Sequence, residues 1–164
     1  MQPRLDKRAV IAAFVSSTRA ALATATAAAQ ATKAGATHEE AKPENDKDTR
    51  AIEASYLAGA QGERVRELER TVGLLDALPR LESTGVVGAG ALVTLAGPGG
   101  HDHRLVCLFA PAGGGEQLEL DGHRVQIVTP RSPLGRALLG AREGDEVEVE
   151  LGRKINRYEV LCIE

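Results

Sequence analysis

The sequence predicts an α+β protein in which an N-terminal antiparallel coiled-coil hairpin precedes a small antiparallel β domain with one short helix. The main observation is a change of hydrophobic period, which is helical before residue 80 and falls to two from Gly85 onward. The second is length, since 164 residues with 43% hydrophobic and 26% charged residues suffice for one domain or two small ones. We therefore expect the hairpin over residues 1–80 and the β domain over residues 85–164.

The first helix of the hairpin is expected to run from about Arg4 to Lys33, and Gly35 is expected to end it. Its apolar and small residues recur at helical spacing, which predicts one face turned toward a partner helix. This stripe consists of Ile11, Phe14, Val15, Thr18, Leu22, Ala25, Ala28 and Ala29.

The second helix has a seam that repeats at alternating steps of three and four residues, which is typical of a coiled coil. Pro79 is expected to end this helix. Large side chains lie early in the first helix and late in the second, and Ala predominates toward the middle of the segment. Only an antiparallel pairing places large beside large and small beside small. The seam consists of Ala51, Ala54, Ala58, Gln61, Val65, Leu68, Val72 and Leu75.

Residues 36–48 join the two helices and form the expected tip of the hairpin. Pro43 disfavours one continuous helix through this point, and acidic side chains outnumber lysines here. Carboxylates are hard oxygen ligands of the kind that hold Mg²⁺ together with waters and phosphate oxygens. Glu44, Asp46 and Asp48 can therefore complete a metal site that belongs to a partner.

The same tip has a simpler interpretation. Its acids also favour the N-terminus of the following helix through the helix dipole, as in many solvated helix ends. Spacing alone favours this interpretation over a metal site.

Five strands are expected in the C-terminal half, where apolar and polar residues alternate. One helix interrupts them: Ser132 caps it, Pro133 occupies its first position and Gly140 ends it. This helix is expected to cover the sheet with Leu134, Leu138 and Leu139. The expected strands are Ala91–Ala96, Arg104–Phe109, Gly122–Val128, Glu146–Leu151 and Tyr158–Ile163.

Composition disfavours several classes of protein. A net charge of −3 disfavours a module that binds duplexes by neutralising phosphates, and 2% aromatic residues leave too few rings to stack on single strands. No transmembrane span is expected, because Thr and Gln interrupt the Ala-rich stretch from Ala20 to Ala31, and no signal peptide is expected either. Cys107 and Cys162 are too few for a disulfide framework, so both thiols are expected inside strands in a reducing cytosol.

Three other candidate sites are weaker. The glycines of residues 85–90 open a strand rather than a helix, so a dinucleotide fold is rejected. A metal site without a suitable fourth ligand can be imagined at His101, His103 and His123. A basic contact face, against a default of ordinary surface charge, can form at Arg131, Arg136 and Arg142.

One motif resembles a known family. Ser132-Pro-Leu-Gly-Arg-Ala-Leu-Leu-Gly140, followed by Glu143-Gly-Asp-Glu-Val-Glu-Val149, resembles the C-terminal signature of the GreA/GreB transcription elongation factors. The upstream Gly88-Ala-Gly-Ala-Leu-Val-Thr-Leu95 is similar to the first strand of that family's C-terminal domain, and the hairpin precedes the sheet in both. The resemblance implies an FKBP-like fold for the β domain.

The resemblance also implies a function. In that family the hairpin enters the secondary channel of bacterial RNA polymerase, where tip acids help to hold the second catalytic Mg²⁺ for cleavage of backtracked RNA. By this resemblance Glu44, Asp46 and Asp48 are the catalytic and metal-binding residues, in a Mg²⁺ site completed by the polymerase beside the RNA 3′ end. The chain itself is then expected to be no enzyme, to hold no cofactor tightly alone, and to act in the cytoplasm as a monomer without a membrane.

The tip departs from the family pattern, which usually reads Gly-Asp-Leu-x-Glu-Asn-Ala-Glu-Tyr, whereas this chain has Lys42-Pro-Glu-Asn-Asp-Lys-Asp-Thr-Arg50. We therefore carry over an acidic tip without matching individual positions. A noncatalytic Gre-like regulator or inhibitor of RNA polymerase is the alternative function. A prolyl isomerase that uses the FKBP-like domain ranks last, because Phe109 and Tyr158 are too few aromatic residues for a proline pocket.

Overall fold

The computed structural model describes residues 5–38, 49–78 and 84–164. These residues form two compact units. The sheet unit comprises the chain up to Val15 together with Gly73–Glu164, and the hairpin unit comprises Ser16–Val72. The boundary crosses both long helices, so one end of each helix belongs to the sheet unit.

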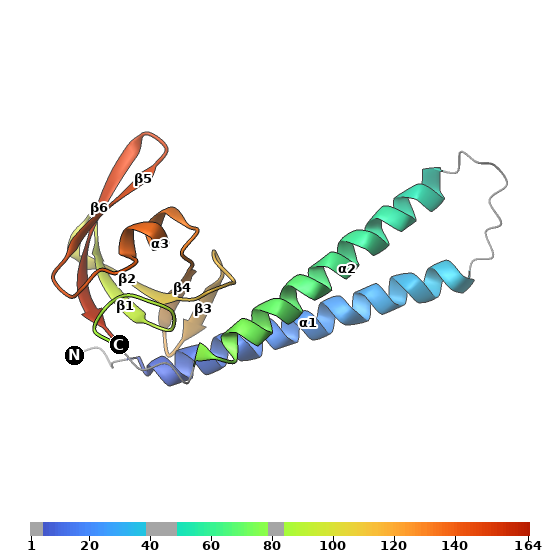
Figure 1. The fold of residues 1–164 in the computed structure, drawn as a ribbon, viewed down its shortest axis with the longest axis horizontal. Helices are drawn as coiled ribbons and strands as arrows, with labels where there is room; N and C mark the ends of the chain where they lie inside the picture. The colour runs from blue at the N-terminus through green and yellow to red at the C-terminus, as the bar shows by residue number, and fades with distance from the viewer. Residues whose placement is uncertain (1–4, 39–48, 79–83) are drawn as a thin grey trace. The chain divides into compact units, whose positions relative to one another are not determined.

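In the described part of the chain, two long helices precede a six-stranded sheet with one short helix (Figure 1). This architecture confirms the predicted fold class, a helical hairpin followed by a mainly antiparallel sheet. The helices are α1 (Lys7–His38), α2 (Thr49–Leu75) and α3 (Pro133–Leu138). The strands are β1 (Leu92–Gly97), β2 (Gly100–Phe109), β3 (Gln117–Leu120), β4 (His123–Val128), β5 (Glu146–Leu151) and β6 (Lys154–Ile163).

Helix α1 begins and ends later than predicted. It begins at Lys7 rather than Arg4, because the Asp6 carboxylate caps it by accepting a 3.0 Å hydrogen bond from the Arg8 amide. The prediction that Gly35 ends the helix is wrong, because α1 continues to His38. A glycine in a helix interior costs roughly 0.5–1 kcal/mol relative to alanine, which is too little to end a long helix.

The strand order is β3-β4-β2-β1-β6-β5. The sheet departs from the expected antiparallel pattern at one pair, since β2 and β4 run parallel with Val106 opposite Val125. The cause is β3, which the sequence analysis did not predict. The chain leaves β2, forms β3 at the outer edge and returns antiparallel to it in β4, which therefore runs in the direction of β2.

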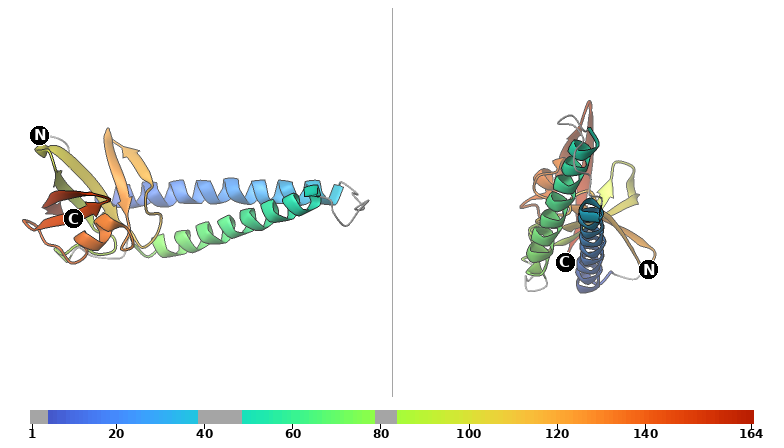
Figure 2. Two further views of the ribbon diagram at one scale, coloured as in Figure 1. Left: turned by 90° about the horizontal axis from the view of Figure 1, so that it is seen from above. Right: turned by 90° about the vertical axis from the view of Figure 1, so that its right-hand side faces the viewer.

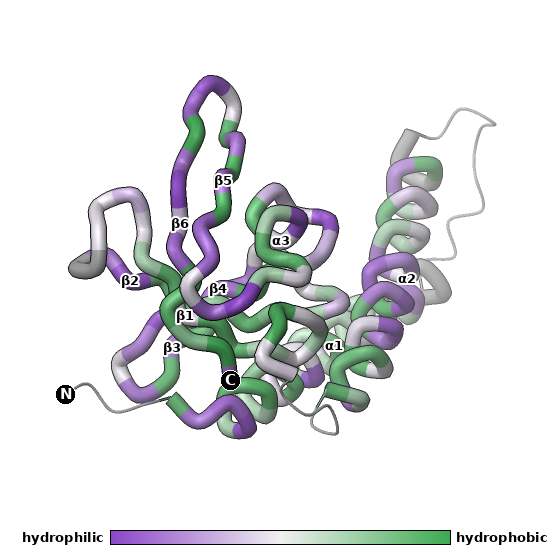
Figure 3. Tube along the Cα trace, turned by 60° about the vertical axis from the view of Figure 1, so that its left-hand side comes forward, coloured by the Kyte–Doolittle hydropathy of each residue, from purple (hydrophilic) through white to green (hydrophobic). Residues whose placement is uncertain are grey.

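The central strands bury side chains on both faces of the sheet. In β2, Cys107 and Phe109 point to one face and Val106 and Leu108 to the other, as the strand period of two requires. Helix α3 covers the first face, which we call the α3 core. The sheet-unit ends of α1 and α2 cover the second, which we call the helix-root core. In Figure 3 the hydrophobic residues gather where the strands meet the first turns of α1.

The helix-root core confirms the predicted pairing of large side chains. Val10, Ile11 and Phe14 come from the start of α1, Leu75 ends α2, and Leu78 follows it. Each of these side chains is at most 1% exposed. An antiparallel pairing is the arrangement that brings the early residues of α1 and the late residues of α2 to one place.

In the hairpin unit, α1 and α2 run side by side in opposite directions (Figure 2). The predicted seam is buried only in the second half of α2: Leu68 is buried and Val65 half-buried, whereas Ala54 and Ala58 are exposed. The alanines in the first half of α2 therefore bury little apolar surface. On α1 the predicted stripe is buried at Ile11, Phe14 and Thr18, half-buried at Val15, Leu22, Ala25 and Ala29, and exposed at Ala28.

Contrary to the sequence-based expectation, one segment of α1 has the length and composition of a membrane span. In Lys7–Ala34 the most apolar 18-residue window has a mean hydropathy of 1.3. Its first turns, however, contain Val10, Ile11 and Phe14, which are buried in the helix-root core. Packing against the sheet therefore accounts for these three residues, whereas only 22% of the window as a whole is buried.

Two glycines in α2 weaken the helix without contributing to packing. A Cβ atom added at Gly59 or Gly62 would meet no atom within 4 Å. We predict that Gly59→Ala and Gly62→Ala each stabilise the helix by roughly 0.5–1 kcal/mol, because alanine loses less backbone entropy on folding. The measurement is thermal unfolding of the full chain followed by circular dichroism.

Gly113→Ala is the matched control. Gly113 has a φ of +78°, and a Cβ there would lie 2.4 Å from Cζ of the Phe14 ring. The same exchange is therefore expected to destabilise the protein by roughly 1–2 kcal/mol, the cost of a left-handed conformation for a residue with a Cβ. Similar effects at all three glycines would contradict the open surroundings described for Gly59 and Gly62.

Candidate functional site

The two long helices flank the predicted tip. Helix α1 ends at His38 and α2 begins at Thr49, so the acidic segment of the sequence connects these two helix ends. Glu44, Asp46 and Asp48 lie outside the described residues, and their role as metal ligands stays a prediction. Within the described ranges, no group of three His, Cys, Asp or Glu side chains is arranged to hold a metal ion.

The start of α2 exposes large apolar side chains. Ile52 is 51% exposed, Tyr56 77% and Leu57 54%. Glu53 is exposed among them. The sequence analysis followed only the seam and missed this patch. The four-residue spacing of Ile52 and Tyr56, which places both on one face of a helix, was the signal that could have found it.

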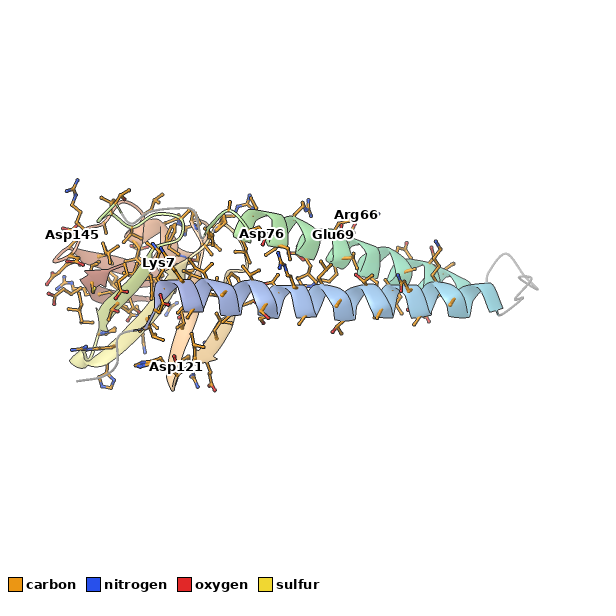
Figure 4. The ribbon with its side chains drawn as sticks, turned by 90° about the horizontal axis from the view of Figure 1, so that it is seen from below. Lys7, Arg66, Glu69, Asp76, Asp121 and Asp145 are labelled. Carbon is orange, nitrogen blue, oxygen red and sulfur yellow. The ribbon has the colours of Figure 1, made fainter. Side chains whose placement is uncertain are left out.

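Farther along α2 the helix surface is charged and solvated. Arg64 Nη1 lies 2.8 Å from Glu67 Oε2, and more than half of each side chain is exposed, so this ion pair contributes at most about 1 kcal/mol. Figure 4 labels Arg66 and Glu69 on the same stretch. Positive and negative side chains are mixed along this stretch, so its surface has no uniform charge. The shallow groove on this surface is lined by Ala60, Glu63, Arg64, Arg66, Glu67 and Arg70.

Local hydrogen bonds hold the signature residues at the start of α3 to the preceding loop. The Ser132 hydroxyl caps α3 by accepting a 3.0 Å hydrogen bond from the Gly135 amide, as predicted. The same hydroxyl donates a 2.9 Å hydrogen bond to the Thr129 carbonyl. Because a Cβ on Gly135 would lie 1.8 Å from that carbonyl oxygen, only glycine lets α3 approach the preceding loop so closely.

The second part of the signature holds β6. The Glu143 carboxylate accepts a 2.8 Å hydrogen bond from the Ile163 amide, and the Gly144 amide donates a 2.8 Å hydrogen bond to the Val160 carbonyl. The Asp145 carboxylate accepts a 2.8 Å hydrogen bond from the Arg142 amide. The bonds to Ile163 and Val160 secure β6 where its pairing with β1 shifts register. The signature residues therefore have structural roles.

One leucine of the signature does not pack as predicted. Leu138 is fully buried in the α3 core and Leu134 packs against that core, but Leu139 is 56% exposed. Leu139 follows the last residue of α3, where the chain is no longer helical, and therefore turns away from the sheet. The nearby arginines are exposed as well, and the Arg136 side chain donates a 3.0 Å hydrogen bond to the Arg131 carbonyl.

The described cysteine and histidine side chains do not form a reactive or metal-binding cluster. Burial raises the pKa of the Cys107 thiol to about 12, so this thiol stays protonated near neutral pH. Cys162 is half-buried in β6. His103 is exposed and His123 half-buried, and the side chain of His101 lies outside the described residues.

Most charged side chains of β5 and β6 are exposed. Glu148 Oε1 accepts a 2.8 Å hydrogen bond from Arg157 Nε, and this bond with the charge of Glu148 raises the pKa of Arg157. Both side chains are mostly exposed, so this pair also contributes little to stability. Asp121 and Asp145, labelled in Figure 4, lie in turns beside β3 and β5.

Residues 118–164 match the family model for the C-terminal part of the transcription elongation factors GreA and GreB. This segment contains the whole hydrogen-bonded signature. The chain belongs to the GreA/GreB family.

Two curated GreA/GreB family members illustrate the relationship. Transcription elongation factor GreA of Ruegeria pomeroyi is 30% identical over 110 residues, which are 67% of this chain and 64% of that protein. GreA of Streptomyces coelicolor is 32% identical over 93 residues, which are 57% of this chain and 53% of that protein. The match thus spans less than two thirds of the length of these relatives.

Solved structures of GreA/GreB family members are also similar. GreA factor homolog 1 of Thermus thermophilus is 24% identical with a TM-score of 0.36, and the match covers 94% of this chain and 92% of that one. A GreA/GreB elongation factor from Nitrosomonas europaea is 20% identical with a TM-score of 0.36, covering 62% of this chain and 89% of that one.

Leu138 and Leu139 provide a matched test of the α3 core. We predict that Leu138→Ala destabilises the sheet unit by roughly 2–5 kcal/mol, because truncation leaves a cavity at a fully buried position. Leu139→Ala is expected to change the free energy of unfolding by less than about 0.5 kcal/mol, because the side chain is exposed. The measurement is the denaturant midpoint of each variant, and equal midpoints for the two would refute the described packing.

Proposed function

We propose that the chain is a transcription elongation factor that binds the secondary channel of bacterial RNA polymerase and promotes cleavage of backtracked RNA. In this proposal it acts in the bacterial cytoplasm as a monomer, and the polymerase supplies the nuclease activity. The observation that carries the proposal is the combination, in a GreA/GreB family member, of two long helices with an acidic connection between them.

The lengths of the two helices support the proposal that the hairpin extends into a partner. Helix α1 has 32 residues and α2 has 27. At a rise of about 1.5 Å per residue, these helices are roughly 48 and 40 Å long. Only one end of each packs in the sheet unit. A length of this order suits a device that carries a few side chains deep into a partner.

The donor set of the tip fits Mg²⁺. Glu44, Asp46 and Asp48 offer hard carboxylate oxygens, and Mg²⁺ in nucleotide-processing sites takes one or two carboxylates with waters and phosphate oxygens. When bound, Mg²⁺ activates water and stabilises charge on the phosphate during hydrolysis. The contribution of this chain is to bring carboxylates to the metal beside the RNA 3′ end. Because the tip supplies only part of the ligand set, tight binding of Mg²⁺ by the isolated chain is not part of the proposal.

A second function is favoured by one specific observation, the departure of the tip from the family pattern. Lys42 and Lys47 alternate with the acids, and the usual Gly-Asp-Leu at the start of the motif is replaced. A lysine close to the carboxylates weakens the attraction of a cation to the tip. A noncatalytic regulator that occupies the channel without stimulating cleavage is therefore the alternative.

Neutralising the tip separates the two functions. We predict that the triple variant Glu44→Gln, Asp46→Asn and Asp48→Asn still binds RNA polymerase but no longer stimulates cleavage, because the amides keep the volume and lose the ligand charge. The measurement is cleavage of the RNA 3′ end in backtracked complexes, beside a polymerase-binding assay at the same salt concentration.

The control variant is Glu63→Gln, which removes an exposed acid from α2 far from the tip and is expected to leave cleavage unchanged. Equal cleavage by the triple variant and the wild type would exclude the catalytic role of the tip acids. Binding without cleavage by the wild type would assign the chain to the regulator alternative.

A further inference from the structure

Among the described residues, none buries the apolar patch at the start of α2. Tyr56 is 77% exposed and Ile52 is 51% exposed, although burying such side chains is worth about 1.5–3 kcal/mol each. The two residues are four positions apart and therefore neighbours on one helix face. Leu57, 54% exposed, is the next residue after Tyr56 but lies about 100° around the helix from it, toward the seam.

The hairpin unit itself does not cover this patch. A helix turns about 100° per residue, so Ile52 lies roughly 160° around α2 from Leu68, the buried residue of the seam. Leu57 lies only about 20° from Leu68 by the same rule, yet it is more than half exposed. The stripe of α1 that pairs with this stretch is mainly Ala, which explains why the leucine stays uncovered. Among the described residues, the patch is thus open to a partner.

The position of the patch next to the tip indicates which partner. Asp48 directly precedes α2, so Ile52 and Tyr56 follow it by four and eight residues. At about 1.5 Å per helical residue, they lie within roughly 6 and 12 Å of the start of the helix. If the tip carboxylates reach a metal inside the polymerase, the patch must be inside as well. The wall of the channel is then the surface that faces these side chains.

We propose that Ile52 and Tyr56 form the apolar contact that holds the hairpin against the wall of the polymerase channel. This inference rests on the proposed function and names the contact that positions the tip. The matching surface is an apolar pocket with a hydrogen-bonding group at its rim, because a buried tyrosine ring needs a partner for its hydroxyl. Tyrosines in such pockets often dominate binding energy at interfaces.

The test compares variants of the full chain in binding to purified core RNA polymerase. The double variant Ile52→Ala, Tyr56→Ala is expected to bind at least tenfold more weakly than the wild type. Leu74→Ala is the matched control, because Leu74 is 49% exposed on the same helix but 18 residues beyond Tyr56. It is expected to bind within twofold of the wild type. Tyr56→Phe keeps the ring and is expected to lose less affinity than the double variant.

Weaker binding by the double variant is not expected to result from a loss of folding. Both substituted side chains are exposed and alanine is the best helix former, so helicity measured by circular dichroism should be unchanged. Equal binding by the double variant and the wild type would overturn the proposed contact and leave the proposed function intact. Failure of the wild type to bind polymerase would instead overturn the proposed function, and this contact with it.

A second copy of the chain is the competing occupant. Sedimentation equilibrium of the wild type and the double variant at the same concentration distinguishes it. A monomeric wild type supports the polymerase contact. A wild-type dimer that the double variant abolishes would assign the patch to self-association and overturn the proposal.

Discussion

Burial of Phe14 and its neighbours against the sheet is the interaction on which the base of the helical hairpin depends. Val10, Ile11 and Phe14 from α1 share one core with Leu75, at the end of α2. A fully buried side chain of this size contributes about 1.5–3 kcal/mol, whereas the alanines farther along α1 bury little apolar area. The same core requires Gly113, because no other residue combines a φ of +78° with contact over the Phe14 ring. The large side chains are thus concentrated where they pack against both the sheet and one another, and the outer stretch is left with small ones.

The family signature has a similar physical explanation, and the explanation limits what the signature says about function. Ser132 and Gly135 hold α3 to the loop before it, and Glu143 holds the end of β6. Each of these residues makes contacts that the sheet unit needs whatever its partner. Similarity in this part of the chain therefore identifies the family and the fold. In the proposed function, cleavage depends on the tip of the hairpin, where the sequence differs from the family pattern. Similarity in the sheet unit therefore does not distinguish the cleavage function from the regulator alternative.

The sequence predicted those features that depend on local chemistry. Large side chains early in the first helix and late in the second predicted the antiparallel pairing seen in the helix-root core. Ser132 and Pro133 predicted the start of α3. Features that depend on distant contacts were missed. The four-residue strand Gln117–Leu120 was not recognised as a strand, so β3 and the resulting parallel pairing of β2 with β4 were not foreseen. Leu139 was misplaced because the helical period was extended one residue past the end of α3. The candidate site shows the same difference between local and distant features. Residue types predicted an acidic tip, whereas the exposure of Tyr56 was seen only in the structure.

The hairpin unit must be stabilised differently from the helix-root core. In α1, the alanines between Ala20 and Ala34 provide the highest intrinsic helix propensity of any residue. Helix α2 lacks this advantage, because Gly59 and Gly62 face open space in its exposed part. A helix with low intrinsic stability gains order when a partner covers one of its faces, since tertiary packing supplies most helical stability in proteins. The exposed patch at Ile52 and Tyr56 lies on this weaker helix, directly after the acidic segment. Covering the patch would therefore remove apolar surface from water and fix the helix that follows the tip. In the proposed function, contact with the channel wall would thus also help to position the carboxylates.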